Sequence, residues 1–217
     1  MSLTLIIANK AYSSWSLRPW ILMRHFEIAF DEIVVPLAQD DTRAELLRYS
    51  PSGKCPALRD SDITVWDSLA IIEYLAEMYP EKPLWPKARA ARARARSLAA
   101  EMHSGFMGLR GLLPMNMRRA VKKVALTPEA SADVARLEQA FQQTRETFGR
   151  AGPFLFGDFS AADAMFAPIV NRLHVYDVAV TPATRAYLDA IMALPAWQEW
   201  HAQAQTEPWK ITKYEVA

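Results

Sequence analysis

Hydrophobic and polar residues follow two different patterns along this chain of 217 residues. In roughly the first eighty residues, short apolar runs typical of strands alternate with runs that have the three-to-four spacing of helices. The predicted elements are, in order, strand 3–8, helix 16–28, strand 31–37, helix 42–49, strands 57–59 and 63–66, and helix 67–79. This order predicts a compact α/β domain with a mixed four-stranded sheet.

A cluster of prolines separates this part from the rest of the chain. Pro80, Pro83 and Pro86 predict a stiff linker, and no later run has the pattern of a strand. The later runs predict helices at 88–113, 128–148, behind the capping signal at 160–163, and from 182 and 195 onward. The prediction is therefore an α/β plus all-α protein, with an α/β domain at 1–80, a proline-rich linker at 81–87 and an all-helical domain at 88–217.

Composition narrows the classes of function. Hydrophobic residues make up 51% and charged residues 23% of the chain, and the net charge is +1, as in an ordinary globular protein with no bias toward nucleic acid or membrane. The single cysteine, Cys55, excludes an internal disulfide and a cysteine-rich zinc site, and no metal is expected. No apolar run is long enough to span a bilayer and no leader opens the chain, which favours a cytoplasmic location.

The turn between the first strand and the first helix gathers hydroxyl groups. Ser13, Ser14 and Ser16 lie there with Arg18, at the start of the helix. A helix N-terminus offers unpaired N–H groups and the positive end of the helix dipole, which suit an anion or a thiolate. Serine is also a preferred N-cap and proline is common in a first turn, so simple capping is the alternative.

Two later segments carry further polar groups. If the Cys55–Pro56 bond is cis, the backbone of Cys55 can pair with a peptide-like ligand, although most bonds before proline are trans. Cys55, beside Lys54, is either a reactive thiol or an inert buried cysteine. Asp67 and Ser68 either cap a helix or bind the amino and carboxylate groups of a free amino acid.

In order and spacing, these segments resemble the cytosolic glutathione transferases over the whole length of the chain. Residues 13–18 resemble the S-S-C-x-x-R motif of the zeta class, with Trp15 where that class has cysteine. Residues 54–58 resemble the segment that contains the family's cis proline. Residues 66–75 resemble its (E/Q/D)-S-x-A-I-x-x-Y-L segment, and residues 160–163 resemble the capping motif of its central helix. The resemblance implies a thioredoxin-like N-terminal domain, a helical C-terminal domain and, commonly, a homodimer.

The resemblance also implies glutathione as co-substrate, with a serine hydroxyl that stabilises its thiolate. The family alignment favours Ser13 as this serine, whereas the four-residue spacing to Arg18 favours Ser14. The thiol of free glutathione has a pKa of about 8.5, so half ionisation at pH 7 requires the protein to lower this pKa by about 1.5 units. This shift corresponds to about 2 kcal/mol, which a hydroxyl donor and a helix dipole can supply. The residues expected to bind glutathione are Ser13, Ser14, Trp15, Arg18, Lys54, Cys55, Pro56, Asp67 and Ser68.

Within this set the resemblance assigns separate roles. Arg18 would support the turn electrostatically, and the backbone of Cys55 would pair with the cysteinyl unit of glutathione. Asp67 and Ser68 would hold the γ-glutamyl end.

We expect a small hydrophobic electrophile to bind between the serine turn and the long predicted helix. One face of that helix carries His103, Met107 and Arg110. Beside it runs a stripe of three glycines, Gly105, Gly108 and Gly111. Glycines inside a helix cost roughly 1 kcal/mol each against alanine, so they indicate either close helix contact or an open ligand cleft.

Three alternatives remain at this point. In zeta enzymes an arginine of the central helix binds the carboxylate of maleylacetoacetate, and Val175 stands at that place here, although Arg172 is nearby. Isomerisation is therefore doubtful and the electrophile stays open. The chain could instead be a non-catalytic scaffold that binds a protein partner, or a glutathione-dependent peroxidase or reductase that uses Cys55; serine at the turn argues against thiol–disulfide exchange.

Overall fold

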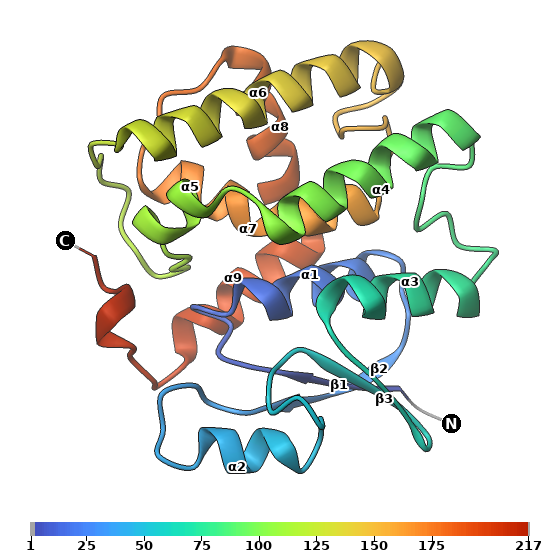
Figure 1. Cartoon of the computed structure of the whole chain (residues 1–217), viewed down its shortest axis with the longest axis vertical. Coiled ribbons are helices and arrows are strands. Elements are labelled where there is room, and N and C mark those ends of the chain that lie inside the picture. The colour runs from blue at the N-terminus through green and yellow to red at the C-terminus, as the bar shows by residue number, and fades with distance from the viewer. Residues whose placement is uncertain (1–2, 217) are drawn as a thin grey trace.

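A mixed sheet forms the first layer of the protein, whose computed structural model describes residues 3–216 (Figure 1). Its four strands are β1 (Leu3–Ile7), β2 (Phe30–Val34), β3 (Ala57–Asp60) and β4 (Ile63–Val65), in the spatial order β2-β1-β3-β4. β1 and β2 are parallel, with Ile7 opposite Val34, whereas β3 is antiparallel to both β1 and β4. The predicted mixed four-stranded sheet is confirmed.

Three helices cover this sheet. α1 (Ser14–His25) and α3 (Ser68–Met78) lie on one face, and α2 (Thr42–Leu47) lies on the other (Figure 1). Side chains cap both long helices, since Ser13 accepts a hydrogen bond from the N–H of Ser16 and Asp67 accepts one from the N–H of Leu69. The sheet with its helices is the expected thioredoxin-like arrangement.

Helices alone make up the second part, apart from two isolated bridges near residues 154–158. They are α4 (Arg89–Ser104), α5 (Met107–Leu112), α6 (Pro128–Phe148), α7 (Ala161–Val175), α8 (Pro182–Met192), α9 (Pro195–Thr206) and a final 3-10 turn (Thr212–Tyr214). α7 is buried on nearly every side and contacts α1, α4 and α8, as expected for a helix that is apolar almost all round. Ser160 and Asp163 form the capping box that the sequence predicts.

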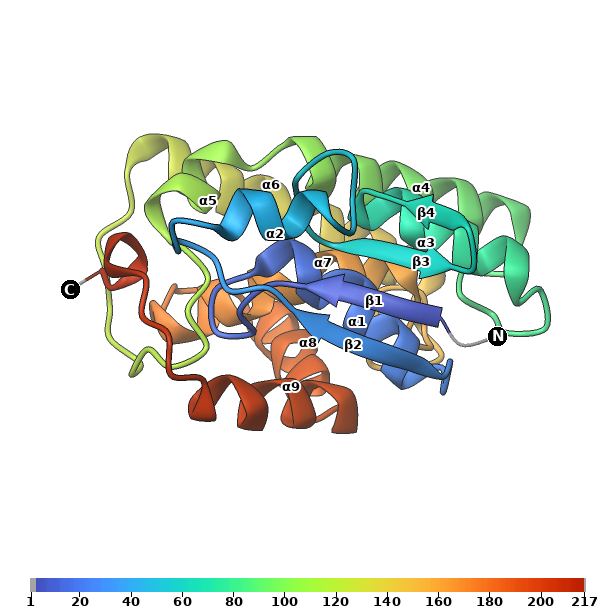
Figure 2. The same cartoon turned by 90° about the horizontal axis from the view of Figure 1, so that it is seen from below.

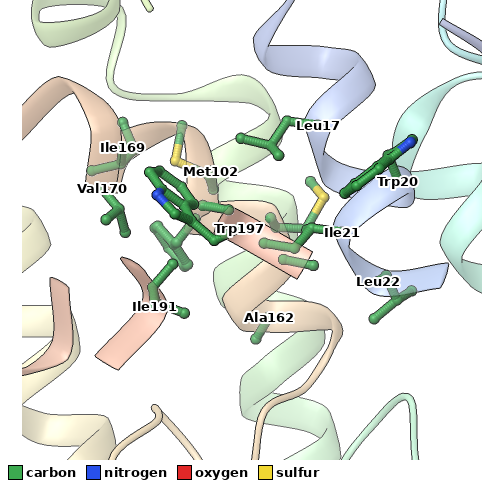
Figure 3. Close-up of a cluster of buried hydrophobic side chains, with 14 of the residues drawn as sticks. Leu17, Trp20, Ile21, Leu22, Met102, Ala162, Ile169, Val170, Ile191 and Trp197 are labelled. Carbon is green, nitrogen blue, oxygen red and sulfur yellow. The ribbon is translucent and has the colours of Figure 1, made fainter. Parts of the chain in front are cut away.

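One hydrophobic core joins the two parts. Figure 3 shows side chains from α1, α4, α7, α8 and α9 that meet in it, among them Leu17, Trp20, Ile21, Met102, Ile169, Val170, Ile191 and Trp197. Figure 1 shows α9 on the same side of the sheet as α1, and Figure 2 shows it next to the β2 edge. Trp20 of α1 and Trp200 of α9 pack edge to face, with their ring centroids 5.0 Å apart. Because α1 contacts both α7 and α9, the helical part fixes the helix that follows the serine turn.

The prediction of one long helix at 88–113 is wrong. The helix ends at Ser104, and a second one, α5, begins at Met107 after Phe106, which has a left-handed φ of 58°. This break buries the Phe106 ring against Phe166, with their centroids 6.4 Å apart. Arg110 Nη1 donates to the carbonyls of His103 and Gly105, at 3.3 and 3.2 Å, so it satisfies groups at the end of α4.

The three glycines consequently have different environments. Gly105 follows the end of α4 and is not inside a helix. At Gly108 a Cβ would lie 2.8 Å from the Cβ of Glu129, so this glycine permits close contact with the start of α6. At Gly111 a Cβ would meet nothing within 4 Å, and that glycine faces open space. Close helix contact therefore accounts for Gly108, whereas a ligand cleft at Gly111 stays a prediction.

Some element ends differ from the prediction by a few residues. α1 runs over Ser14–His25 instead of 16–28, because Ser13 and not a later residue is its N-cap. β2 ends at Val34 instead of 37, since the chain then turns so that the N–H of Leu37 donates to the Asn9 side chain at 2.7 Å. Within residues 3–216, none of the helices combines the length and apolar character needed to cross a membrane.

Candidate functional site

The two adjacent serines of the turn have different hydrogen bonds. Ser13 Oγ accepts from the N–H of Ser16 at 3.4 Å and donates to Ser16 Oγ at 2.8 Å, and Ser16 Oγ also accepts from the N–H of Ala8 at 3.0 Å. The Ser14 hydroxyl makes no hydrogen bond to any residue in 3–216. Ser13 is therefore tied into the start of α1, whereas Ser14 keeps its donor free.

Two cavities flank this turn. The first, the Cys55 cavity, has a volume of about 380 Å³ and is lined by Trp15, Ser52, Lys54, Cys55, Pro56, Trp66 and Asp67. The second, the arginine cavity, has a volume of about 260 Å³ and is lined by Tyr12, Ser13, Ser14, Trp15, Leu37, Met107, Arg110, Gly111, Pro114, Met115, Arg172 and Tyr214. Trp15 belongs to both, so the serine turn lies where the two cavities meet.

The wall of the Cys55 cavity has the backbone arrangement that the sequence suggested. The Cys55–Pro56 peptide bond is cis. Burial raises the pKa of the Cys55 thiol to about 11, and the hydroxyls of Ser16 and Ser13 beside it offset part of that rise. The thiol is therefore protonated at neutral pH, which fits an inert cysteine better than a reactive one.

Asp67 caps α3 and also binds across to α4. Its Oδ1 accepts from the N–H of Leu69 at 3.0 Å, and its Oδ2 lies 3.0 Å from His103 Nε2. The side chain remains 52% exposed at the edge of the cavity. Ser68, in contrast, is fully buried, and its hydroxyl has no partner among the described residues.

Two arginines contact the Trp15 ring. The guanidinium of Arg18 lies 4.2 Å from the ring centroid and that of Arg110 lies 4.8 Å from it. Arg18 is only 1% exposed, and its Nε and Nη1 have no hydrogen-bond partner in residues 3–216. Burial, with the charges of Arg110 and Arg172, lowers the pKa of Arg18 to about 9, so Arg18 stays protonated at neutral pH.

Arg172, on α7, is a site residue that the sequence analysis noted only as nearby. It lines the arginine cavity, its Nε donates to the carbonyl of Leu113 at 2.8 Å, and its Nη1 is buried without a partner. Burial and the charge of Arg110 lower its pKa to about 9. Within residues 3–216, no carboxylate forms an ion pair with Arg18, Arg110 or Arg172. The signal in the sequence was an arginine within the mostly apolar 161–175 run.

The three residues predicted for the electrophile do not line one cavity. Met107, which is 65% exposed, and Arg110 both line the arginine cavity. His103 does not line it: its ring packs against the edge of Trp15 at 5.1 Å and its Nε2 faces Asp67. The reason is the helix break at Phe106, which removes the common face that the prediction assumed. Tyr12, Met115 and Tyr214 also line the cavity and were not predicted. Tyr12 directly precedes the serines, whereas the chain folds back from distant segments to place Met115 and Tyr214 there.

Comparison with known proteins decides the family. The family model for the N-terminal domain of glutathione S-transferases matches residues 12–78, and the model for the C-terminal domain matches residues 118–203. Glutathione S-transferase 1 of Dianthus caryophyllus is 31% identical over 153 residues, which cover 68% of each chain. The chain belongs to the glutathione S-transferase family.

Other relatives agree with this assignment. A maleylacetoacetate isomerase of Rattus norvegicus is 27% identical over 201 residues, 89% of each chain. The fold matches the crystal structure of a glutathione transferase homolog from Burkholderia gl BGR1 with bound glutathione, at a TM-score of 0.72 and 24% identity, over 95% of this chain and all of that one. As a member of this family, the protein is an enzyme of the transferase class with glutathione as co-substrate. Within residues 3–216, no group of three or more His, Cys, Asp or Glu side chains could hold a metal ion.

Proposed function

We propose that this transferase holds glutathione in the Cys55 cavity and presents its thiolate, at the serine turn, to an electrophile in the arginine cavity. One observation carries the proposal: the N-terminus of α1, with its hydroxyls, lies where the two cavities meet at Trp15. Helix N-termini favour anions, so a thiolate placed there is stabilised by the dipole as well as by hydroxyl donors.

The residues of the Cys55 cavity then have separate roles in binding glutathione. The backbone of Cys55, before Pro56, pairs with the cysteinyl unit of the tripeptide, and Lys54 attracts a carboxylate. Asp67 receives the γ-glutamyl ammonium group, because its carboxylate is half exposed at the cavity edge. The hydroxyl of Ser68 lies beside it without a partner and supports this end.

We assign the main thiolate donor to Ser13 and a supporting role to Ser14. The hydroxyl of Ser13 lies beside the Cys55 thiol, and Ser13 also lines the arginine cavity. Ser13 therefore reaches both substrates. Its proton, which now bonds to Ser16 Oγ, can turn to the thiolate, and the thiol proton leaves to solvent. Arg18 adds a positive charge behind the turn, and the ring of Trp15 forms a wall there.

The electrophile site combines apolar walls with positive charge. Leu37, Met107, Pro114 and Met115 supply the apolar surface. Arg110 and Arg172 reach the same space, and Arg172 keeps a buried N–H group without a partner. An unpaired buried charge is costly, so a negatively charged group on the electrophile would satisfy it. We therefore infer a small electrophile with an apolar body and a carboxylate, which agrees with the name of the maleylacetoacetate isomerase relative.

Turnover of serine variants tests the function. Ser13→Ala should lower the rate of glutathione conjugation about a hundredfold at pH 6.5 while glutathione still binds, and Ser14→Ala should lower it less. Thr127→Ala, which removes the N-cap of α6 and lines neither cavity, controls for the loss of a cap. Unchanged turnover in the Ser13→Ala/Ser14→Ala double variant would reject the serine mechanism.

The proposal extends to assembly and location. We propose a homodimer in the cytoplasm, as the family resemblance implies. Light scattering of the purified protein at micromolar concentration should give twice the mass of one chain, and a mass of one chain would reject the dimer.

A further inference from the structure

The turn that carries the serines is held by the far end of the chain. The carbonyl of Lys10 accepts from Trp200 Nε1 of α9 at 2.9 Å, and the carbonyl of Ala11 accepts from the N–H of Met117 at 2.9 Å. Both donors belong to the helical part. Figures 1 and 2 both show the segment after α9 at the same end of the molecule as the loop between β1 and α1. The position of the turn therefore depends on residues outside the sheet domain.

Glu207, just after α9, makes the strongest of these contacts. Its Oε1 accepts from the N–H of Lys10 at 2.6 Å and its Oε2 accepts from the N–H of Ala11 at 2.9 Å. Among residues 3–216, it is the one charged side chain that bonds to the backbone of residues 10 and 11. Hydrogen bonds to a carboxylate are about twice as strong as neutral ones, so this pair fixes the turn firmly.

The Glu207 segment is itself fixed. Arg118 Nη1 donates to the carbonyl of Glu207 at 2.8 Å, and Arg118 Nη2 donates to the carbonyl of Trp209 at 2.6 Å. Arg118 Nη2 also donates to the hydroxyl of Tyr12, which donates to Glu215 in turn. The segment after α9 is thus a fixed frame for the turn.

We propose that Glu207 is a positioning residue for the thiolate-stabilising hydroxyl of Ser13. The turn moves as a unit, because the N–H groups of Tyr12 and Ser13 both donate to the carbonyl of Asn9, at 3.1 and 2.8 Å. A shift of Lys10 and Ala11 therefore shifts the Ser13 hydroxyl relative to glutathione, which Cys55 and Asp67 hold from other elements. This inference rests on the proposed function, and it adds a residue that touches neither substrate.

Glu207→Gln tests the inference, because the amide keeps the size but places a donor against one of the two N–H groups. The pKa of the thiol of bound glutathione should rise by about one unit, which means about tenfold less thiolate near pH 6.5. The rate constant kcat should fall about tenfold at pH 6.5 and approach that of the wild type near pH 9, while KM for glutathione changes less than twofold. Glu199→Gln, on the exposed side of α9 where it faces Arg24, is the matched control.

Two results would overturn the inference. The first is a thiol pKa and a pH profile equal to those of the wild type. The second is an equal loss of rate at every pH together with a lower melting temperature, which would show a purely structural role.

Glu207→Asp provides a second test if the Glu207→Gln variant does not fold. It keeps the negative charge but shortens the side chain by one methylene, so the pKa of the bound thiol should rise less than in Glu207→Gln. If the wild-type enzyme does not lower the pKa of the thiol of bound glutathione, the proposed function fails. If the wild-type enzyme lowers this pKa and both Glu207 variants lower it equally, only the role of Glu207 fails.

Discussion

His103 Nε2 lies 3.0 Å from Asp67 Oδ2, and this contact joins α4 of the helical part to the first turn of α3. The two residues were expected at different sites, one at the electrophile and the other at glutathione. Their pairing places His103 beside a residue of the Cys55 cavity and against the Trp15 ring. The helical part therefore contacts residues of both cavities.

Asp67→Asn tests the binding of the γ-glutamyl end. Asparagine is as good an N-cap as aspartate, so α3 should keep its start, while the charge that receives an ammonium group is lost. We expect a Kd for glutathione about tenfold to a hundredfold higher, the range of about 1.5–3 kcal/mol for a hydrogen bond to a charged group. Calorimetric titration measures it; an unchanged Kd would remove Asp67 from the site.

Arg172→Met separates catalysis from stability. Methionine removes a buried charge that lacks a full set of partners, but it also removes the hydrogen bond to the carbonyl of Leu113, so the melting temperature should change little. The kcat/KM with a carboxylate-bearing unsaturated electrophile should fall at least tenfold, whereas that with a neutral aryl halide should change less than twofold. Arg96→Met, which removes an exposed pair with Glu73, is the control. Equal losses with both electrophiles would contradict a role in binding the carboxylate.

Cys55→Ser distinguishes conjugation from thiol chemistry of the protein itself. With its pKa raised by burial to about 11, the Cys55 thiol should react slowly with iodoacetamide at pH 7.5 and faster as the pH rises toward 10. The serine variant should keep most of its conjugating activity, since only the backbone of residue 55 is needed. Complete loss of activity in this variant would instead support a peroxidase or reductase that uses Cys55.

Asp163→Asn tests the capping box under α7. The buried carboxylate accepts from the N–H of Leu155 and from the N–H and hydroxyl of Ser160, at 3.1, 2.9 and 2.9 Å. Losing part of this set should lower the free energy of unfolding by about 2–3 kcal/mol in urea titrations near pH 4, where the contribution of this group is largest. Asp158→Asn, at an exposed neighbour, should change it little.

The difference in the free energy of unfolding between wild type and Asp163→Asn should change with pH in a definite direction. Burial raises the pKa of Asp163 in the folded protein to about 6, above the ordinary value near 3.9. The folded state therefore holds this proton more tightly, so its contribution to stability is fully present below about pH 4 and is lost as the pH rises through about 6. The gap between wild type and Asp163→Asn should narrow between pH 4 and pH 7. A gap that widens would contradict this assignment.

Local patterns were enough to predict the sheet, the caps and the serine turn. Strand runs, the Asp67 cap and the capping box at Ser160 depend on neighbours in sequence, and the structure has them where they were expected. The break at Phe106 could not be predicted, because burial of its ring against Phe166 is a tertiary contact. The same is true of Arg172 and Tyr214, which reach the arginine cavity from segments far from the serines. The domain boundaries at 80–81 and 87–88 stay predictions.

Ultraviolet absorbance of the thiolate, followed from pH 5 to pH 9 with glutathione bound to wild-type protein and to Ser13→Ala, tests the central claim most directly. Wild type should ionise the thiol at least one unit below its free pKa of about 8.5, and Ser13→Ala should shift ionisation back toward that value. Thr127→Ala should titrate like wild type. If bound glutathione in the wild-type protein ionises at its free pKa, or if Ser13→Ala ionises it as wild type does, Ser13 does not stabilise the thiolate.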